Sequence, residues 1–224
     1  MKIKRKTPWF TAILLIVSLL LTIGCGSDKK TQVTVHDAVQ TEGNQTDMSI
    51  TVADGYEKID QVTTFVNLQM DSGKHIVIEL DPKNAPISVA NFQKLVGESF
   101  YDEIIFHRVI AGFMIQGGDP EGTGRGGSKE QIKGEFASNG VDNRLSHERG
   151  VVSMARTPSP NSASSQFFIC HGDSEFLDGD YAAFGRVIFG MDEVDRIATL
   201  QKDGNDFPAI PPVMERVFFV NPVS

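Results

Sequence analysis

The stretch FHRVIAGFMIQGGDPEGTGRGG, from Phe106 to Gly127, combines features that rarely occur together. It opens with an apolar set around one histidine and one arginine, and six glycines crowd into its last eleven residues. Three structures suit such a composition: a phosphate-binding loop, a core strand followed by a turn, or the floor of a substrate groove. The surrounding chain decides among them.

The segments around this stretch predict a β-rich domain. VTTFVNLQM (62–70) and HIVIEL (75–80) alternate like strands around the turn residues DSGK, which is a hairpin pattern. A helix is expected at 85–98, because Pro86 suits a first helical turn and apolar residues recur every three or four positions. Further strands are expected at 104–110, 113–118, 150–156, 165–170, 182–190 and 214–220, and a second helix at 191–201. Many short strands with glycine turns and two helices favour an antiparallel barrel or sandwich.

The start of the chain has a different character. Four basic residues precede the apolar run WFTAILLIVSLLLTIG (9–24), which is shorter than the roughly 20 residues that a membrane-spanning helix needs. This is the pattern of an export signal over residues 1–24. The sequence LTIGCGS resembles the lipobox of bacterial lipoproteins, with Cys25 as the lipidated N-terminus, although Thr22 stands where leucine is usual. The alternative is an uncleaved anchor helix. Both place the remaining chain at the extracytoplasmic face of a cell membrane.

Residues 25–60 are polar and lack sustained periodicity, so they predict a flexible tether to a domain at 61–224. A short extra strand at MSITV (48–52) is the alternative. Loss of the four basic signal residues changes the formal net charge from −8 to −12. Such an acidic chain argues against nucleic-acid binding, which needs basic patches. The second cysteine, Cys170, lies in an apolar strand pattern and is expected to be a buried free thiol.

Other functional motifs are incomplete. Gly122, Gly124 and Gly127 match the dinucleotide pattern G-x-G-x-x-G, but no amphipathic helix follows them. The five histidines lack metal-binding spacing, so we expect neither a metal nor another cofactor. No G-x-S-x-G elbow accompanies the serines of TPSPNSASSQ, which argues against a hydrolase. Strand alternation predicts that His107 faces the core as a hydrogen-bonded polar group, opposite Arg108.

Together with GVVSMARTPSPNSASSQFFIC (150–170) and EFLDGDYAAFGRVIFGMDEVDRI (175–197), the opening stretch resembles the cyclophilin family of peptidyl-prolyl cis-trans isomerases. The resemblance covers about residues 62 to 220. It implies a closed eight-stranded antiparallel β-barrel capped by two α-helices, with a substrate groove on its outer face. It also implies an enzyme that accelerates rotation about X-Pro bonds without a cofactor.

The resemblance assigns roles to particular residues. It implies a catalytic Arg108, polar neighbours at Gln116 and Gln166, and a proline pocket that begins at Phe113. The residues expected to act on substrate are Arg108, Gln116 and Phe113 in catalysis, and Met114, Ala155, Arg156, Gln166, Phe168, Phe176, Leu177 and Tyr181 in binding. Ala155 and Arg156 would pair with the peptide through their main chain. Phe176 and Tyr181 replace a tryptophan and a histidine of the animal form, which leaves only weak cyclosporin binding open.

The residues by themselves leave two points open. Arg108 could pair with a loop acid such as Asp119 and have a purely structural role. The consecutive apolar pairs Phe113–Met114 and Phe167–Phe168 favour a groove, since only one member of each pair can face the core on a strand. We expect Phe167 in the core and Phe168 in the groove.

The resulting hypothesis is a monomeric, lipid-anchored prolyl isomerase that assists the folding of exported, proline-containing polypeptides. Two alternatives keep the tether and change the activity. One is a non-catalytic proline-binding module, and the other is a chaperone-like holdase.

Overall fold

The computed structural model describes residues 50–223. The predicted signal sequence, Cys25 and most of the predicted tether lie outside these residues. The strands are β1 (Tyr56–Lys58), β2 (Phe65–Met70), β3 (His75–Leu80), β4 (Ile104–Ile110), β5 (Met114–Gly117), β6 (Val151–Met154), β7 (Phe167–Cys170), β8 (Ala183–Phe189) and β9 (Val213–Pro222). The α-helices are α1 (Pro86–Gly97) and α2 (Met191–Ala198), and two short 3-10 helices are η1 (Ala137–Asn139) and η2 (Glu175–Leu177). Each strand and helix predicted from residue 62 onward is confirmed, with small differences at its ends.

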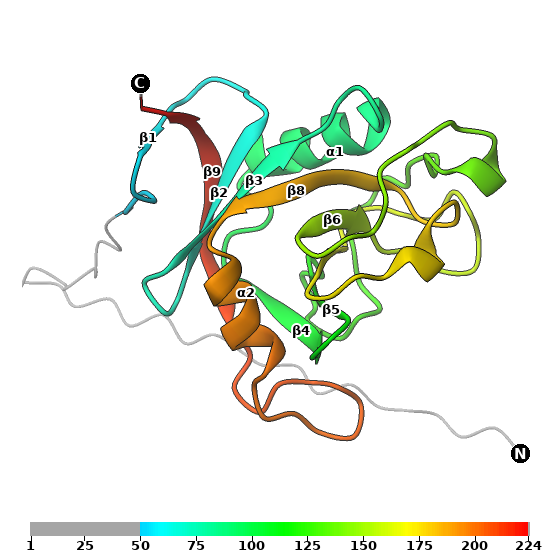
Figure 1. Ribbon diagram of the computed structural model, residues 1–224. Coiled ribbons are helices and arrows are strands. Elements are labelled where there is room, and N and C mark those ends of the chain that lie inside the picture. Colours follow the sequence, from blue (N-terminus) through cyan, green and yellow to red (C-terminus); the bar gives the residue numbers. More distant parts are fainter. Residues whose placement is uncertain (1–49, 224) are drawn as a thin grey trace, which may run out of the picture. The chain divides into compact units, whose positions relative to one another are not determined.

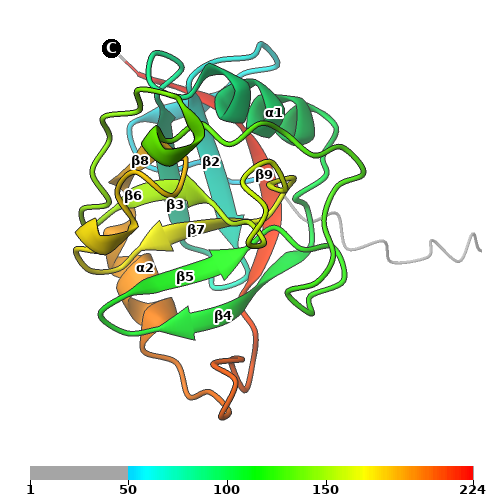
Figure 2. The same cartoon turned by 90° about the vertical axis from the view of Figure 1, so that its right-hand side faces the viewer.

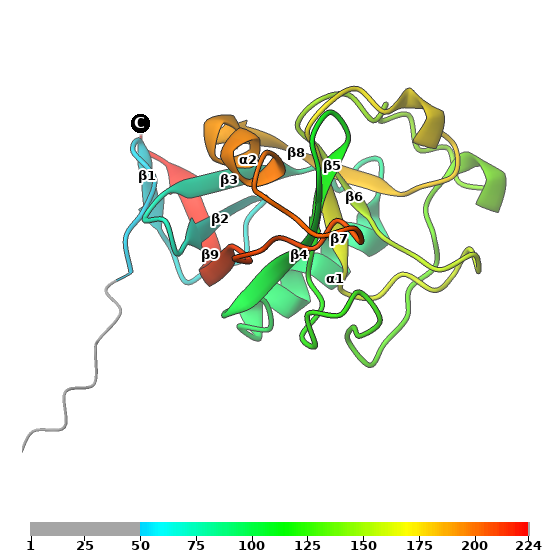
Figure 3. The same ribbon diagram turned by 90° about the horizontal axis from the view of Figure 1, so that it is seen from below.

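Strands β2 to β9 form a closed antiparallel barrel (Figures 1 and 2). Their order is β9-β2-β3-β8-β6-β7-β5-β4, and the pairing of β4 with β9 closes the barrel. Helices α1 and α2 lie on opposite sides of it (Figure 3). The predicted apolar face of α1 is confirmed, because its buried residue Phe92 packs against the rings of Tyr101, Phe167 and Phe184. The predicted eight-stranded barrel with two helices is therefore correct.

The domain begins earlier in the chain than the predicted boundary at residue 61. Strand β1 pairs with the end of β9, which places a ninth strand outside the closed barrel. Ala53, only 2% exposed, packs there with Val77 and Phe218. These outward-facing apolar side chains on β3 and β9 need a cover, and the segment 50–60 supplies it. The assignment of 50–60 to a flexible tether is thus wrong. The alternative strand at 48–52 is not formed at residues 50–52, and its first two residues lie outside the described part of the chain.

A β-bulge in β4 changes the predicted orientation of His107. Phe106 pairs with Gly117 and Arg108 pairs with Gln116, so His107 is an extra residue in its strand. Phe106 belongs to the barrel core, whereas His107 lines the same outer cleft as Arg108. Neither ring nitrogen of His107 has a hydrogen-bond partner within residues 50–223. The prediction of a hydrogen-bonded core histidine is wrong, because simple alternation does not account for an inserted residue.

Candidate functional site

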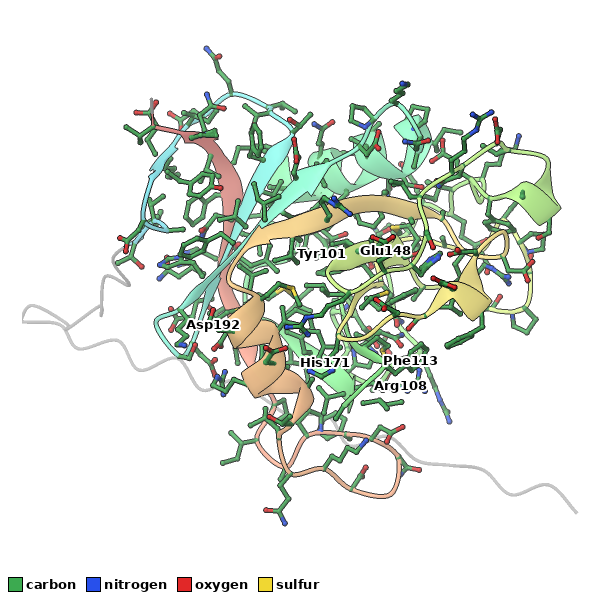
Figure 4. All side chains as sticks on the ribbon, in the orientation of Figure 1. Tyr101, Arg108, Phe113, Glu148, His171 and Asp192 are labelled. Carbon is green, nitrogen blue, oxygen red and sulfur yellow. The ribbon has the colours of Figure 1, made fainter. Side chains whose placement is uncertain are left out.

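Arg108 lies on the outer surface of the barrel, beside Phe113 (Figure 4). Its place opposite Gln116 follows from the pairing of β4 with β5. The guanidinium Nη1 lies 3.5 Å from Gln116 Oε1, and Nε lies 3.8 Å from Asp206 Oδ2. The side chain is 42% exposed, so the cation can reach a molecule in the groove.

A chain of side-chain amides continues from Arg108 to the glycine-rich loop. Gln116 donates through Nε2 to Gln166 Oε1 at 2.9 Å. Gln166 in turn donates through Nε2 to the carbonyl oxygen of Gly126 at 2.7 Å. The two predicted polar neighbours of the arginine therefore form one hydrogen-bonded relay, which ties the guanidinium to a loop on the groove's edge.

The glycine-rich loop folds around the carboxylate of Asp119. This side chain is 1% exposed and accepts hydrogen bonds from the backbone amides of Glu121, Thr123 and Gly126 at 2.8, 3.0 and 3.1 Å. Burial alone would raise the pKa of Asp119, but these bonds together outweigh it and hold the pKa below its usual range. A Cβ on Gly126 would clash with the carboxylate of Asp119, which explains that glycine. Asp119 therefore shapes the loop, and the acid near Arg108 is Asp206.

Next to the arginine is a cleft of about 220 Å³. It is lined by Arg108, Phe113, Met114, Gln116, Ala155, Arg156, Phe168, Leu177 and Tyr181, all of them predicted site residues. Gln166 lines a second, adjoining cleft of about 450 Å³ together with Gln116, Ala155 and Arg156. Phe176 stands at the rim, 72% exposed, with its ring 5.4 Å from that of Phe113. The structure thus brings all the predicted groove residues together.

The two consecutive apolar pairs, Phe113–Met114 and Phe167–Phe168, differ in how they face the core and the cleft. Phe167 faces the barrel core and Phe168 faces the cleft, as predicted. Phe113 and Met114, by contrast, both pack on the cleft side. Alternation does not separate them because Phe113 lies in the turn before β5, where the period of a strand does not yet apply.

The backbone beside the cleft offers two free groups to a peptide. The Ala155 carbonyl and the Arg156 amide have no hydrogen-bond partner within residues 50–223, whereas the Ala155 amide donates to the Gln166 carbonyl at 2.9 Å. The Arg156 side chain is occupied by the fold, since its guanidinium lies 4.6 Å from the ring of Tyr181 and donates to the Asp180 carbonyl. An extended peptide could therefore pair with this segment at two positions.

A buried polar cluster supports the cleft from behind, and no spacing in the sequence indicated it. His147 Nδ1 lies 2.7 Å from Asp178 Oδ1, and His147 Nε2 lies 3.0 Å from Ser153 Oγ. Ser153 is fully buried, so this Ser-His-Asp arrangement cannot act on a substrate. Burial lowers the pKa of His147 more than Asp178 raises it. The imidazole stacks on Phe168 at 17° between ring planes, and so fixes one wall of the cleft.

Two general features complete the description of residues 50–223. No helix among them is long and apolar enough to span a bilayer. No three of their His, Cys, Asp or Glu side chains gather in a group that could hold a metal ion.

Comparison with known proteins gives concordant results. The family described as cyclophilin-type peptidyl-prolyl cis-trans isomerase matches residues 65–218. A peptidyl-prolyl cis-trans isomerase of Schizosaccharomyces pombe is 44% identical over 147 residues, which are 65% of this chain and 92% of that protein. Another, from Acinetobacter baylyi, is 46% identical over 142 residues, 61% of this chain and 73% of that one.

A solved structure agrees with these relatives. The crystal structure of a cyclophilin-type isomerase from Cryptosporidium parvum is similar with a TM-score of 0.65 and 29% identity. The match covers 72% of this chain and 99% of that chain. A second structure of the same protein, solved in the presence of the dipeptide Ala-Pro, has a TM-score of 0.63 and 31% identity, and covers 69% and 97% of the two chains.

Proposed function

Since this chain belongs to the family of cyclophilin-type peptidyl-prolyl cis-trans isomerases, we propose that it isomerises X-Pro bonds at Arg108 in polypeptides exported across the membrane that anchors it. Isomerisation itself is the activity of the family. The location of the activity and the roles of the groove residues are the proposal. The observation that carries it is the juxtaposition of a half-exposed arginine, fixed by Gln116, with an apolar cleft of about 220 Å³.

The chemistry of a prolyl bond explains why an arginine suits this place. Resonance between the nitrogen lone pair and the carbonyl sets a rotation barrier of about 18–20 kcal/mol. At the twisted transition state the lone pair is localised on the proline nitrogen. A planar amide nitrogen accepts hydrogen bonds poorly, whereas a pyramidal one accepts them well. A fixed cationic donor therefore stabilises the transition state more than either ground state, which is what acceleration requires.

The residues around Arg108 can divide the work of holding the substrate. Phe113, Met114, Phe168 and Leu177 present the apolar surface that a pyrrolidine ring needs, and they exclude water from it. The free Ala155 carbonyl and Arg156 amide can fix the chain on one side of the proline, so that only the other side turns. A relative solved in the presence of Ala-Pro supports a proline-containing peptide as the ligand.

The cellular setting rests on the N-terminal sequence. A basic start, a short apolar run and the LTIGCGS stretch support export and lipid attachment at Cys25, as in bacterial lipoproteins. Two or more acyl chains on that cysteine would suffice for stable anchoring, whereas one alone would not. The enzyme would then meet its substrates as they emerge unfolded on the extracytoplasmic side.

The decisive experiment measures isomerisation of a proline-containing chromogenic peptide by the full chain. Arg108→Ala is expected to lower kcat/KM by about 100-fold or more, the usual effect of removing a transition-state donor. Arg144→Ala is the matched control, because Arg144 is 80% exposed and, among residues 50–223, pairs only with Asp142. Equal rates for the wild type and Arg108→Ala would remove the catalytic role of Arg108 and favour a binding module or a holdase.

The anchor needs a separate test. Cells expressing the full chain and its Cys25→Ser variant are grown with radioactive palmitate. Label is expected on the wild-type chain only. Equal labelling of both chains would exclude lipid attachment at Cys25.

A further inference from the structure

We infer that Asp206 is a positioning residue for the reaction, because it orients the Arg108 guanidinium from a loop that replaces a missing strand beside β4. The inference rests on the proposed role of Arg108 and adds a residue outside the groove. Asp206 does not line the proline cleft, and neither its spacing nor its neighbours in the sequence pointed to it.

The loop before β9 completes the hydrogen bonding of β4 next to Arg108. Strand β4 pairs with β9 only at Ile104 and Ile105, so its edge is open further along. There the Val109 amide donates to the Asp206 carbonyl at 2.9 Å, and Lys202 Nζ donates to the Val109 carbonyl at 3.0 Å. The loop therefore binds both the amide and the carbonyl of Val109, which directly follows Arg108 in the chain.

The same two loop residues also act on the guanidinium. Lys202 Nζ donates to Asp206 Oδ1 at 2.7 Å, which leaves Asp206 Oδ2 beside Arg108 Nε at 3.8 Å. Gln116 Oε1 accepts from Nη1 on the other side. Two of the three guanidinium nitrogens are thus engaged, and Nη2 has no partner within residues 50–223. Because the Lys202 ammonium offsets much of the negative charge of Asp206, the positive charge of the Arg108 guanidinium at Nη2 is only partly neutralised.

The backbone at Asp206 gives an independent indication. Its φ is +64°, a left-handed conformation that glycine adopts freely and that aspartate and asparagine adopt more readily than other residues with a side chain. The loop enforces this conformation: the Asp206 amide donates to the Asp203 carbonyl, and Asp203 Oδ1 accepts from the amides of Asn205 and Phe207. Glycine would fit position 206 without strain, so the benefit of aspartate lies in its carboxylate.

Stability alone does not explain the ion pair. The two side chains are 42% and 32% exposed, and pairs of this kind contribute little to folding. The Asp206 carboxylate limits the rotamers of the long Arg108 side chain. It thereby increases the fraction of time that the guanidinium points at the substrate, which raises the rate without stabilising the fold. Loss of Asp206 should therefore lower kcat rather than raise KM, and leave the melting temperature almost unchanged.

The test uses Asp206→Asn and Asp206→Gly in the full chain, each alone and combined with Arg108→Ala. Asparagine keeps the shape and tolerates the left-handed backbone, while glycine removes the side chain and the strain. Asp203→Asn is the control, because it removes the same charge from the same loop and keeps an oxygen that accepts the two amides. We expect kcat/KM to fall about 3- to 10-fold in both Asp206 variants, mainly through kcat, and to stay within about twofold in the control.

The double variants separate positioning from general structural damage. If Asp206 acts through Arg108, its replacement lowers activity no further once Arg108 is alanine. The same fold loss in both backgrounds would overturn the inference, as would wild-type activity of both Asp206 variants. Wild-type activity of Arg108→Ala alone would instead refute the proposed role of Arg108, so the two failures can be told apart.

Discussion

The amide relay from Arg108 to the glycine-rich loop predicts a graded loss of activity along its length. Gln116 contacts the guanidinium directly, and Gln166 contacts it only through Gln116. Replacing either by leucine keeps the approximate volume and removes the hydrogen bonds. We expect the largest loss for Arg108→Ala, a smaller one for Gln116→Leu, and the smallest for Gln166→Leu.

The distances set the magnitudes. Gln116→Leu removes the long 3.5 Å contact to Arg108 and the 2.9 Å bond to Gln166. At about 0.5–1 kcal/mol for each, the total is about 1–2 kcal/mol, or roughly 5- to 30-fold in kcat/KM. Gln166→Leu leaves the Arg108 contact in place and loosens Gln116 from behind, so the loss should be about 2- to 5-fold.

The assay is the decay of the cis form of a chromogenic Ala-Pro peptide, followed with the full chain and each variant at several substrate concentrations. Melting temperatures are measured in parallel, and both variants should stay close to the wild type because the amides are only partly buried. A loss for Gln166→Leu that equals or exceeds that for Gln116→Leu would refute the idea that the relay acts through the arginine.

Three further predictions concern the support of the site. Asp119→Ala leaves three loop amides without their acceptor and should lower the free energy of unfolding by about 2–4 kcal/mol, measured by urea denaturation. Asp142→Ala, at an exposed position, is the control. An equally small loss of stability in both variants would show that Asp119 does not hold the loop. Burial raises the pKa of the Cys170 thiol to about 12, so in the Cys25→Ser chain iodoacetamide at pH 8 should label Cys170 only after unfolding, and rapid labelling of the folded chain would disprove its burial. Burial also lowers the pKa of His147 below its usual value of 6.5, so the unfolded chain takes up the proton at a higher pH than the folded chain. The stability that comes from a neutral, buried His147 is therefore present above pH 6.5 and is lost as the pH falls below it. The melting temperature should fall less between pH 8 and 5 in His147→Gln than in the wild type, and an equal fall in both would contradict this role of His147.

The rate constant itself should stay nearly flat from about pH 7 to 9, because the proposed chemistry uses no titrating base. The pKa values of His107 and His147 are both lowered by burial, so both imidazoles are neutral over this range. A steep limb within it, measured with the chromogenic peptide, would show that a titrating group takes part in the reaction.

Local patterns in the sequence predicted the elements of the fold. Alternation at 75–80 predicted β3, and the three- and four-residue spacing of apolar residues at 85–98 predicted α1, whose buried face includes Val89, Phe92 and Val96. These periods depend only on backbone geometry. The split between Phe167 and Phe168 followed from the same rule. The resemblance to a family then indicated which residues meet in the groove.

What the sequence determined by itself was therefore every feature that depends on neighbours along the chain: the strands β2 to β9, the two helices and an antiparallel β-rich domain. The choice of a barrel over a sandwich and the residues of the groove were implied by the resemblance to a family. Tertiary structure alone decided the rest. The β-bulge in β4 places His107 on the groove side of the barrel, and β1 pairs with the end of β9. The fold also brings Asp206 next to Arg108, and Asp178 next to His147. Each of these depends on the register and closure of the barrel, which bring distant residues together through contacts that no local period encodes.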